Sequence, residues 1–330
     1  MLDAVFNHEG ISLVGATPPE KSRRSAVHPV VRAMLAPLSK YYDDLDLMEL
    51  FLVGPQRLVL QYRNQPEKAV EDSSLSIAAI EKICKTLANH HRLNFDPVAA
   101  PNLSCTLPGG HRFECAIGAS IQEGVSATIR CKHPFEASPQ DFGLDEDIAQ
   151  CLFRAVEEGQ HIVISGGTNT GKTTLLNMLL RTLPTKTRIL CAEDTPEIVY
   201  DQFYKGMGLI AARSAEVPGQ LTWPGITDHI NRSTPDRVIF GEISVRNAQS
   251  ALAVLNAGIE GFMCTIHAST PEMALKRKFG QNLDMAGTPM QAVHEFLNDM
   301  VDLVIQINRS EGCRKVVSVW DVKHKTELLK

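Results

Sequence analysis

The apolar positions of the first 130 residues recur at two different spacings. Between residues 30 and 38 they fall at helical spacing, which predicts one amphipathic helix. Residues 48–53 and 57–62 read as two strands with a Gly-Pro-Gln turn between them, so a hairpin is expected. The same reading predicts a further helix over 77–88 and further strands over 113–117 and 127–131. This mixture indicates a small α+β unit.

Two prolines between Lys132 and Pro139 interrupt this pattern, and the apolar positions of residues 148–156 begin a new helix. Short apolar runs follow, and they read as buried strands. We therefore expect a loose tail over 1–26, an α+β sensor domain over 27–133, a linker over 134–143 and an α/β domain over 144–330.

The stretch from Gly166 to Thr173 fits the phosphate-binding loop G-x-x-x-x-G-K-[ST] at every fixed position. An apolar strand precedes it and a helix follows it, as such a loop requires. We expect Lys172, a solvated charge, to reach the β and γ phosphates and the Thr173 hydroxyl to bind Mg2+. The predicted ligands are ATP and Mg2+, and the predicted nucleotide-binding residues are Gly166, Gly167, Thr168, Asn169, Thr170, Gly171, Lys172, Thr173 and Thr174.

Acidic residues close two of the later apolar runs. Glu193 ends the run that starts at Arg188, and Glu242 ends the run that starts at Arg237. Residues just past the carboxyl ends of parallel strands line the ligand crevice, so both acids are expected to face the phosphates, with Glu242 near Mg2+. Glu197 and Asp236 are interpreted as solvated turn residues.

The order of these segments resembles the secretion ATPase superfamily. The loop is followed by Glu193-Asp-Thr-Pro-Glu-Ile, then by Pro235-Asp-Arg-Val-Ile-Phe-Gly-Glu-Ile, then by Gly261-Phe-Met-Cys-Thr-Ile-His-Ala. These segments are similar to the Walker A, Asp-box, Walker B and His-box motifs of that superfamily. Residues 107–112, 127–130 and 301–307 make the chain most similar to its type IV secretion and conjugation branch.

The resemblance implies a RecA-like P-loop NTPase domain behind a smaller α+β N-terminal domain. It also implies a homohexamer that hydrolyses ATP to power substrate transport or pilus assembly in a type IV secretion system. Such a motor binds inner-membrane components at the cytoplasmic face of the inner membrane.

The resemblance also assigns candidate roles to single residues. Glu193 matches the general base and Glu242 the acid near Mg2+ and the attacking water, although these two roles could be exchanged. His267 matches the His-box imidazole, which can donate to the γ phosphate or to Glu242. Arg112 and Arg130 resemble the N-terminal arginines that reach the phosphates; the alternative is that both are surface residues on a strand edge.

Arg232 is a third arginine candidate for the phosphates. The chain departs from the family pattern at Thr234 and Ser244, where relatives tend to have arginine.

Two absences separate the branches of the superfamily. Type II secretion members carry paired C-x-x-C zinc motifs, and none of the eight cysteines here forms such a pair. Pilus retraction members end in an Ala-Ile-Arg-Asn-Leu-Ile segment, which residues 283–330 lack. A type IV pilus motor, a P-loop kinase and a scaffold that binds ATP with little hydrolysis remain the alternatives.

Composition agrees with a cytoplasmic enzyme. The chain has 330 residues, 44% hydrophobic and 22% charged, which suffices for two domains. We expect no transmembrane segment and no signal peptide, because neither pattern occurs. The net charge of -5 gives no bulk attraction to nucleic acid, so no direct sequence-specific nucleic-acid binding is predicted. The scattered cysteines read as reduced core residues.

Overall fold

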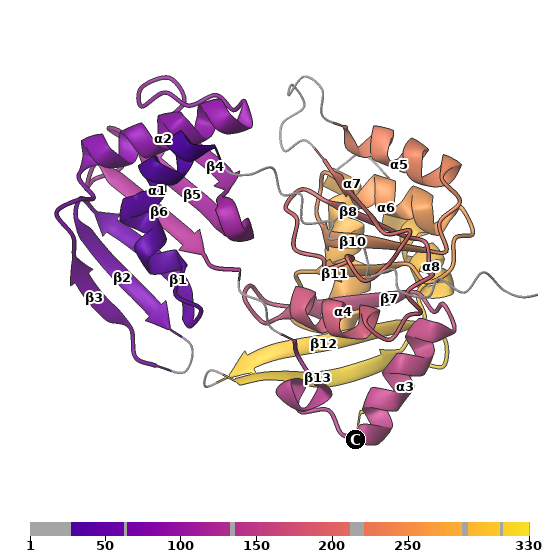
Figure 1. The fold of residues 1–330 in the computed structure, drawn as a ribbon. Helices are drawn as coiled ribbons and strands as arrows, with labels where there is room; N and C mark the ends of the chain where they lie inside the picture. Colours follow the sequence, from indigo (N-terminus) through magenta and orange to yellow (C-terminus); the bar gives the residue numbers. More distant parts are fainter. Residues whose placement is uncertain are drawn as a thin grey trace, which may run out of the picture.

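The structure is a computed structural model of the chain. It describes residues 28–62, 65–132, 136–211, 221–285, 290–310 and 313–329. The tail expected over 1–26 lies outside the described residues. Figure 1 shows two lobes, one built around an antiparallel sheet and one around a larger mixed sheet, joined by the segment that follows the strand β6.

The elements follow one another in two series. The strands are β1 (Leu47–Gly54), β2 (Arg57–Tyr62), β3 (Lys68–Glu71), β4 (Asn102–Thr106), β5 (Arg112–Ile117), β6 (Val125–Arg130), β7 (Ile162–Gly166), β8 (Ile189–Glu193), β9 (Met207–Ile210), β10 (Arg237–Ile243), β11 (Met263–Ile266), β12 (Leu303–Ser310), β13 (Cys313–Asp321) and β14 (Thr326–Glu327). The helices are α1 (Pro29–Tyr42), α2 (Ile77–His91), η1 (Pro108–Gly110), η2 (Pro139–Phe142), α3 (Glu146–Glu157), α4 (Lys172–Leu180), α5 (Trp223–Arg232), α6 (Ala248–Leu255), η3 (Met273–Phe279), α7 (Gly280–Met285) and α8 (Met290–Met300).

The N-terminal sheet has six antiparallel strands in the order β3-β2-β1-β6-β5-β4. The helices α1 and α2 pack against it in one hydrophobic cluster, to which Leu35, Ile83 and Phe113 belong. The predicted hairpin is confirmed as the antiparallel pair β1 and β2. Its turn uses left-handed backbone at Gln56, with φ of 63°, which is uncommon for a non-glycine residue.

The C-terminal sheet has eight strands in the order β14-β13-β12-β7-β11-β10-β8-β9. The strands from β12 to β9 run parallel, and the β12–β13–β14 meander is antiparallel. Helices cover both faces, so successive residues of one strand enter different cores. In β10, for example, Val238 and Phe240 join one cluster and Ile239 joins the other. This explains why the strands read as continuous apolar runs.

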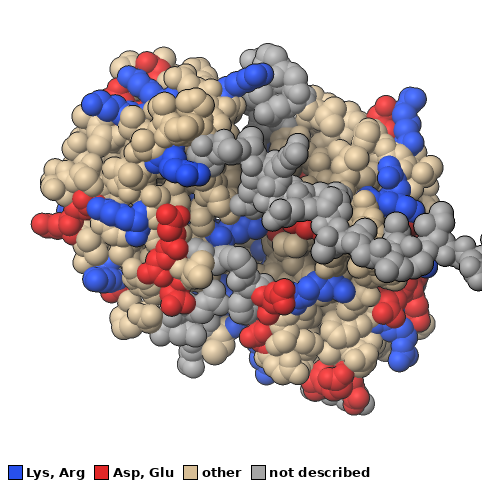
Figure 2. All heavy atoms as spheres, viewed as in Figure 1, with Lys and Arg blue, Asp and Glu red and all other residues tan. Residues whose placement is uncertain are grey.

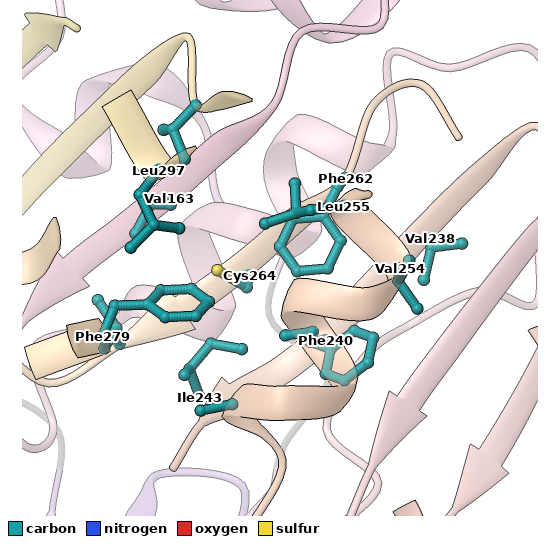
Figure 3. Packing of buried hydrophobic residues seen from close by; sticks show 14 of the residues in the cluster. Val163, Val238, Phe240, Ile243, Val254, Leu255, Phe262, Cys264, Phe279 and Leu297 are labelled. Atoms are coloured by element: carbon teal, nitrogen blue, oxygen red, sulfur yellow. The ribbon is translucent and has the colours of Figure 1, made fainter. Parts of the chain in front are cut away.

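Large aromatic side chains fill the cluster that includes α6 and α8. Phe240 on β10 and Phe262 just before β11 have ring centroids 5.5 Å apart, and Cys264 lies beside them (Figure 3). All eight cysteines are free and Cys264 is fully buried, but Cys151 and Cys313 are exposed, so the reading of the cysteines as core residues was wrong for these two.

The segment expected to be a linker has structure of its own where it is described. Its helix η2 begins with a capping box, in which Ser138 and Asp141 bond reciprocally. Ala137 and Phe142 are buried in the same cluster as α3 and α4. Residues 137–142 therefore pack on the C-terminal lobe.

The predicted fold class is confirmed, with an antiparallel N-terminal sheet domain and a mixed α/β C-terminal sheet domain. None of the helices in the described part of the chain combines the length and the apolar character that crossing a bilayer requires. The parallel strands β7, β8, β10 and β11 all end at one edge of the C-terminal sheet, so the segments that follow them meet there.

Asp72 joins α1 to the turn between β3 and α2. Its carboxylate accepts hydrogen bonds from the Tyr41 hydroxyl at 2.8 Å and the Ser74 hydroxyl at 2.6 Å, and pairs with Lys40 at 2.7 Å. Burial acts to raise the pKa of Asp72, but the hydrogen bonds from Lys40, Ser74 and Tyr41 outweigh it and lower the pKa well below its usual range.

We therefore expect Asp72→Asn to destabilise the N-terminal lobe by about 1–3 kcal/mol at pH 7. Because the folded pKa lies below the unfolded one, this advantage of Asp72 shrinks as the pH falls below about 4. Amide hydrogen exchange in α1 and α2 measures the opening free energy. The exposed Glu71→Gln is the control, and equal protection in both variants at pH 7 would contradict the expectation.

Candidate nucleotide-binding site

The loop between β7 and α4 has the backbone geometry of a phosphate cradle. Its strand ends at Gly166, and α4 begins at Lys172 after Gly171, whose φ of 94° favours glycine. A Cβ at Gly166 would meet the Ile307 carbonyl and come within 2.7 Å of Thr170 Oγ1, so this position has no room for a side chain. The loop amides and the N-terminus of α4 together favour an anion.

Lys172 is buried, with 6% of its surface exposed. Its Nζ donates to the carbonyls of Gly166 at 3.2 Å and Gly167 at 2.8 Å. Burial lowers the pKa of Lys172 to about 8; the Arg130 charge adds to this lowering and the Glu242 charge opposes it. The expectation of a solvated lysine was therefore wrong, because the loop folds around its own ammonium group.

His267 connects Lys172 to Glu242. Its Nδ1 lies 3.2 Å from Lys172 Nζ, and its Nε2 lies 3.1 Å from Glu242 Oε1. Since the ammonium group can only donate, this network assigns Nδ1 as an acceptor and places the proton on Nε2, where it donates to Glu242. The sequence analysis gave a hydrogen bond from His267 to Glu242 as one of two possibilities, and the structure has this hydrogen bond.

Glu242 is held ionised on the wall of the site. Burial acts to raise its pKa, but the hydrogen bond from His267 and the charges of Lys172 and Arg112 outweigh it, so the pKa is lowered. About half of the Glu242 side chain, 52%, remains exposed. An ionised carboxylate of this kind is suited to a hard cation or to water.

Glu193 has the opposite environment. It ends β8 with 3% of its surface exposed, and burial raises its pKa to about 7, although its Oε1 accepts from the amides of Glu197 at 2.8 Å and Ile198 at 3.0 Å. A Cβ at Gly241 would lie 2.9 Å from Glu193 Cγ, so glycine leaves the space that the carboxylate occupies. Its Oε2 is buried and has no hydrogen-bond partner among the described residues.

Glu197 belongs to the site, although the sequence reading left it as a solvated turn residue. Its Oε2 accepts from the Thr173 hydroxyl at 3.3 Å, and its Oε1 lies 3.9 Å from Arg112. Asn177 of α4 holds the same segment by donating to the Glu197 carbonyl at 3.1 Å. The sequence held one signal for this position, which is that Glu197 follows Glu193 by four residues. The chain turns between them, so that the Glu197 amide binds Glu193 while the Glu197 side chain lies beside the phosphate loop. Asp236 instead accepts from the Arg188 amide at 2.7 Å.

Two arginines of the N-terminal lobe reach the site. Arg112 donates to the Thr195 hydroxyl at 2.9 Å, across the junction of the lobes, and Arg130 donates from Nε to Glu49 at 2.9 Å. Their strands β5 and β6 are both internal to the sheet, so the alternative of two residues on a strand edge is wrong. Lys132 adds a second contact between the lobes, from its Nζ to the Pro196 carbonyl at 3.0 Å.

A cavity of about 720 Å³ lies between the lobes and is where these residues meet. Figure 2 shows acidic and basic side chains close together in the hollow between the lobes. All six predicted catalytic residues line the cavity, as do the loop residues from Thr168 to Thr174. Lining residues that sequence reasoning missed include Glu49, Glu136, Asn177, Arg181, Glu197 and Arg314.

Arg232 stands apart from this cavity. It lies exposed on α5 and pairs with Asp228 at 2.8 Å, one helical turn away. Ser244, one of the two departures from the family pattern, caps a turn, because its amide donates to Asn247 Oδ1 at 2.7 Å. The other, Thr234, adopts left-handed backbone with φ of 47°.

Comparison with known proteins identifies relatives along most of the chain. The family model described as type II/IV secretion system protein matches residues 118–327. The chain is 30% identical to a conjugal transfer protein TrbB of Rhizobium radiobacter, covering 85% of each protein. It is 25% identical to the type IV secretion system protein VirB11 of Bartonella henselae, covering 88% of this chain and 92% of the relative.

Solved structures share the fold at lower identity. The Legionella pneumophila ATPase DotB superposes with a TM-score of 0.59 at 13% identity, covering 92% of this chain and 84% of DotB. The pilus retraction motor PilT with bound ADP superposes with a TM-score of 0.56 at 15% identity, covering 85% of this chain and 80% of PilT.

The raised pKa of Glu193 makes the stability of the C-terminal lobe depend on pH. Between its unfolded pKa of about 4.5 and its folded pKa of about 7, the folded state binds more protons, so raising the pH destabilises it. Glu193→Gln removes this dependence. We therefore compare the unfolding free energies of the variant and the parent. Between pH 5 and pH 8 the difference, variant minus parent, should rise by about 1–3 kcal/mol, because only the parent loses stability over this range.

Urea unfolding followed by tryptophan fluorescence measures this, because Trp223 and Trp320, the two tryptophans of the chain, lie in the C-terminal lobe. The exposed neighbour Asp194 provides the control variant Asp194→Asn. A difference between Glu193→Gln and the parent that stays constant over this pH range would contradict the raised pKa.

Proposed function

This chain belongs to the type II/IV secretion system protein family, and from that membership we propose that it is the motor ATPase of a type IV secretion or conjugation system. The observation that carries the proposal is one cavity that combines a phosphate loop, two carboxylates with opposite pKa shifts, and arginines from a second lobe. We propose that these groups bind ATP and hydrolyse it.

The loop and its lysine bind the phosphates in this proposal. Amides of residues 166–173 and the N-terminus of α4 surround the phosphate oxygens. Lys172 exchanges its bonds to the carbonyls of Gly166 and Gly167 for bonds to the β and γ phosphates. Its lowered pKa, about 8, still leaves it mostly protonated at neutral pH.

Glu193 acts as the general base. A base is most effective when its pKa lies near the working pH, and burial places the pKa of Glu193 at about 7. Its Oε1 is occupied by two backbone amides, so Oε2 is the atom that takes the proton from the attacking water. Glu242, ionised and bonded to His267, orients that water instead of deprotonating it.

The oxygen atoms around Thr173 fit Mg2+. The Thr173 hydroxyl and the carboxylates of Glu197 and Glu242 are hard oxygen donors on the cavity wall, and the lowered pKa of Glu242 keeps it charged. When bound, Mg2+ would neutralise charge on the β and γ phosphates. Thr173 and Glu242 would hold it, directly or through water.

Arg112 and Arg130 couple the two lobes to the nucleotide. Both side chains are about one third exposed at the cavity wall, so either can turn toward phosphate oxygens without a change of fold. Arg112 already donates to Thr195 across the junction of the two lobes of one chain. A nucleotide bound beside Arg112 would strengthen this contact. Hydrolysis then loosens the junction, which provides the motion of the motor.

We further propose that six copies form a ring at the cytoplasmic face of the inner membrane, where inner-membrane components of the secretion apparatus bind it. Membership of the family and similarity to VirB11 and TrbB support this assembly. A P-loop kinase remains the alternative from another class, and it differs in needing an acceptor for the phosphate.

Phosphate release from ATP without any acceptor tests the function. We expect the purified chain to hydrolyse ATP unaided and, with ATP bound, to sediment as a particle of about 218 kDa, six times 36.3 kDa. Lys172→Ala should abolish the turnover, because the ammonium group is the main charge on the β and γ phosphates. Turnover that requires an acceptor would favour the kinase, and near-normal turnover by Lys172→Ala would exclude this cavity.

Removing either arginine tests the coupling between lobes. We expect Arg130→Ala and Arg112→Ala to lower turnover, by about a thousandfold if the arginine contacts the transferred phosphate only in the transition state. Steady-state hydrolysis measures this, with Arg57→Ala, an exposed arginine of β2, as the control. If both variants match the control, the N-terminal lobe is a passive adaptor.

A further inference from the structure

The hairpin β12–β13 delivers one more arginine to the phosphate loop. Arg314 is the second residue of β13 and lines the cavity. An ideal Cβ at Gly171 would lie 2.7 Å from Arg314 Cδ and 3.2 Å from its Nε, so the Arg314 side chain crosses directly over Gly171. Gly171 is the residue before α4, where the loop amides converge.

The strand order separates Arg314 from the acids. β7, which leads into the loop, has β11 on one side and β12 on the other. His267, Glu242 and Glu193 all come from the β11–β10–β8 side. Arg314 comes from the opposite side, and antiparallel pairing of β12 with β13 puts it at the same carboxyl edge as the loop.

Nucleotide orientation follows from this separation. The transferred phosphate must lie near Lys172 and the two acids, because the attacking water and its base are there. The remainder of the nucleotide then extends toward the β12 side of the loop. Arg181, another arginine on the cavity wall, donates to the Ala137 carbonyl and is tied to the segment before η2.

We propose that Arg314 binds a phosphate that is not transferred, the α phosphate next to the ribose, and so sets the affinity for ATP and ADP alike. Its planar guanidinium suits two-point recognition of phosphate oxygens, and Gly171 leaves room for its stem over the loop. This inference rests on the proposed nucleotide-binding function. It gives the C-terminal hairpin a role in retaining product after hydrolysis.

Titration calorimetry with ADP tests the proposal directly. We expect Arg314→Ala to weaken ADP and ATP binding by the same factor, about 10-fold to 100-fold, as for a charge-assisted hydrogen bond. Arg314→Lys, which keeps the charge and loses the fork, should show an intermediate loss.

Arg309→Ala is the matched control. Arg309 on β12 lies opposite Arg314 in the ladder of the same hairpin, and it is exposed. Unchanged ADP affinity in Arg314→Ala, or a fall in kcat at constant affinity, would overturn the proposal. An equal loss in Arg309→Ala would overturn it too, because the effect would then belong to the hairpin as a whole. If the parent binds ADP but hydrolyses no ATP, the proposed function fails while the ADP titration still decides the role of Arg314.

Discussion

Parallel hydrogen bonding among β7, β11, β10 and β8 is the constraint on which the site depends. Ladder pairs such as Thr265 with Ile164 and Phe240 with Ala192 hold the strands in register, and their carboxyl ends meet at one edge. The loop, the His-box imidazole and both acids are thereby assembled from segments up to about a hundred residues apart. Helices on both faces bury the strands and hold this edge in place.

Two carboxylates at this edge have opposite character for physical reasons. Glu193 is enclosed between strands beside Gly241, and loss of water raises its pKa to about 7. Glu242 faces the cavity and is surrounded by His267, Lys172 and Arg112, which keep it ionised. When two neighbouring carboxylates have pKa values that differ in this way, the one with the raised pKa is suited to act as a base and the other to remain charged. The same division resolves which glutamate we propose as the base, a choice that the motifs left open.

In the proposed function, the junction of the lobes connects chemistry to movement. Its polar contacts among the described residues include those from Arg112 to Thr195 and from Lys132 to the Pro196 carbonyl, and both end in the short turn between Glu193 and Glu197. In the proposed mechanism, this turn carries the base Glu193 at one end and the carboxylate of Glu197 at the other, so nucleotide binding would act on both ends of it. Polar contacts of this size can break and reform without unfolding either core.

Local patterns in the sequence determined the first hairpin, several of the helices and strands, the phosphate loop and the family resemblance, because hydrophobic periodicity and glycine spacing are properties of neighbouring residues. They also selected Glu193, Glu242 and His267 as strand-end residues. Tertiary structure alone decided that Lys172 is buried, that Glu197 returns to the loop, that Arg314 crosses Gly171 and that Arg232 stays outside. Burial and approach between distant segments depend on how the sheet pairs and how the lobes meet, and no local pattern encodes those distances.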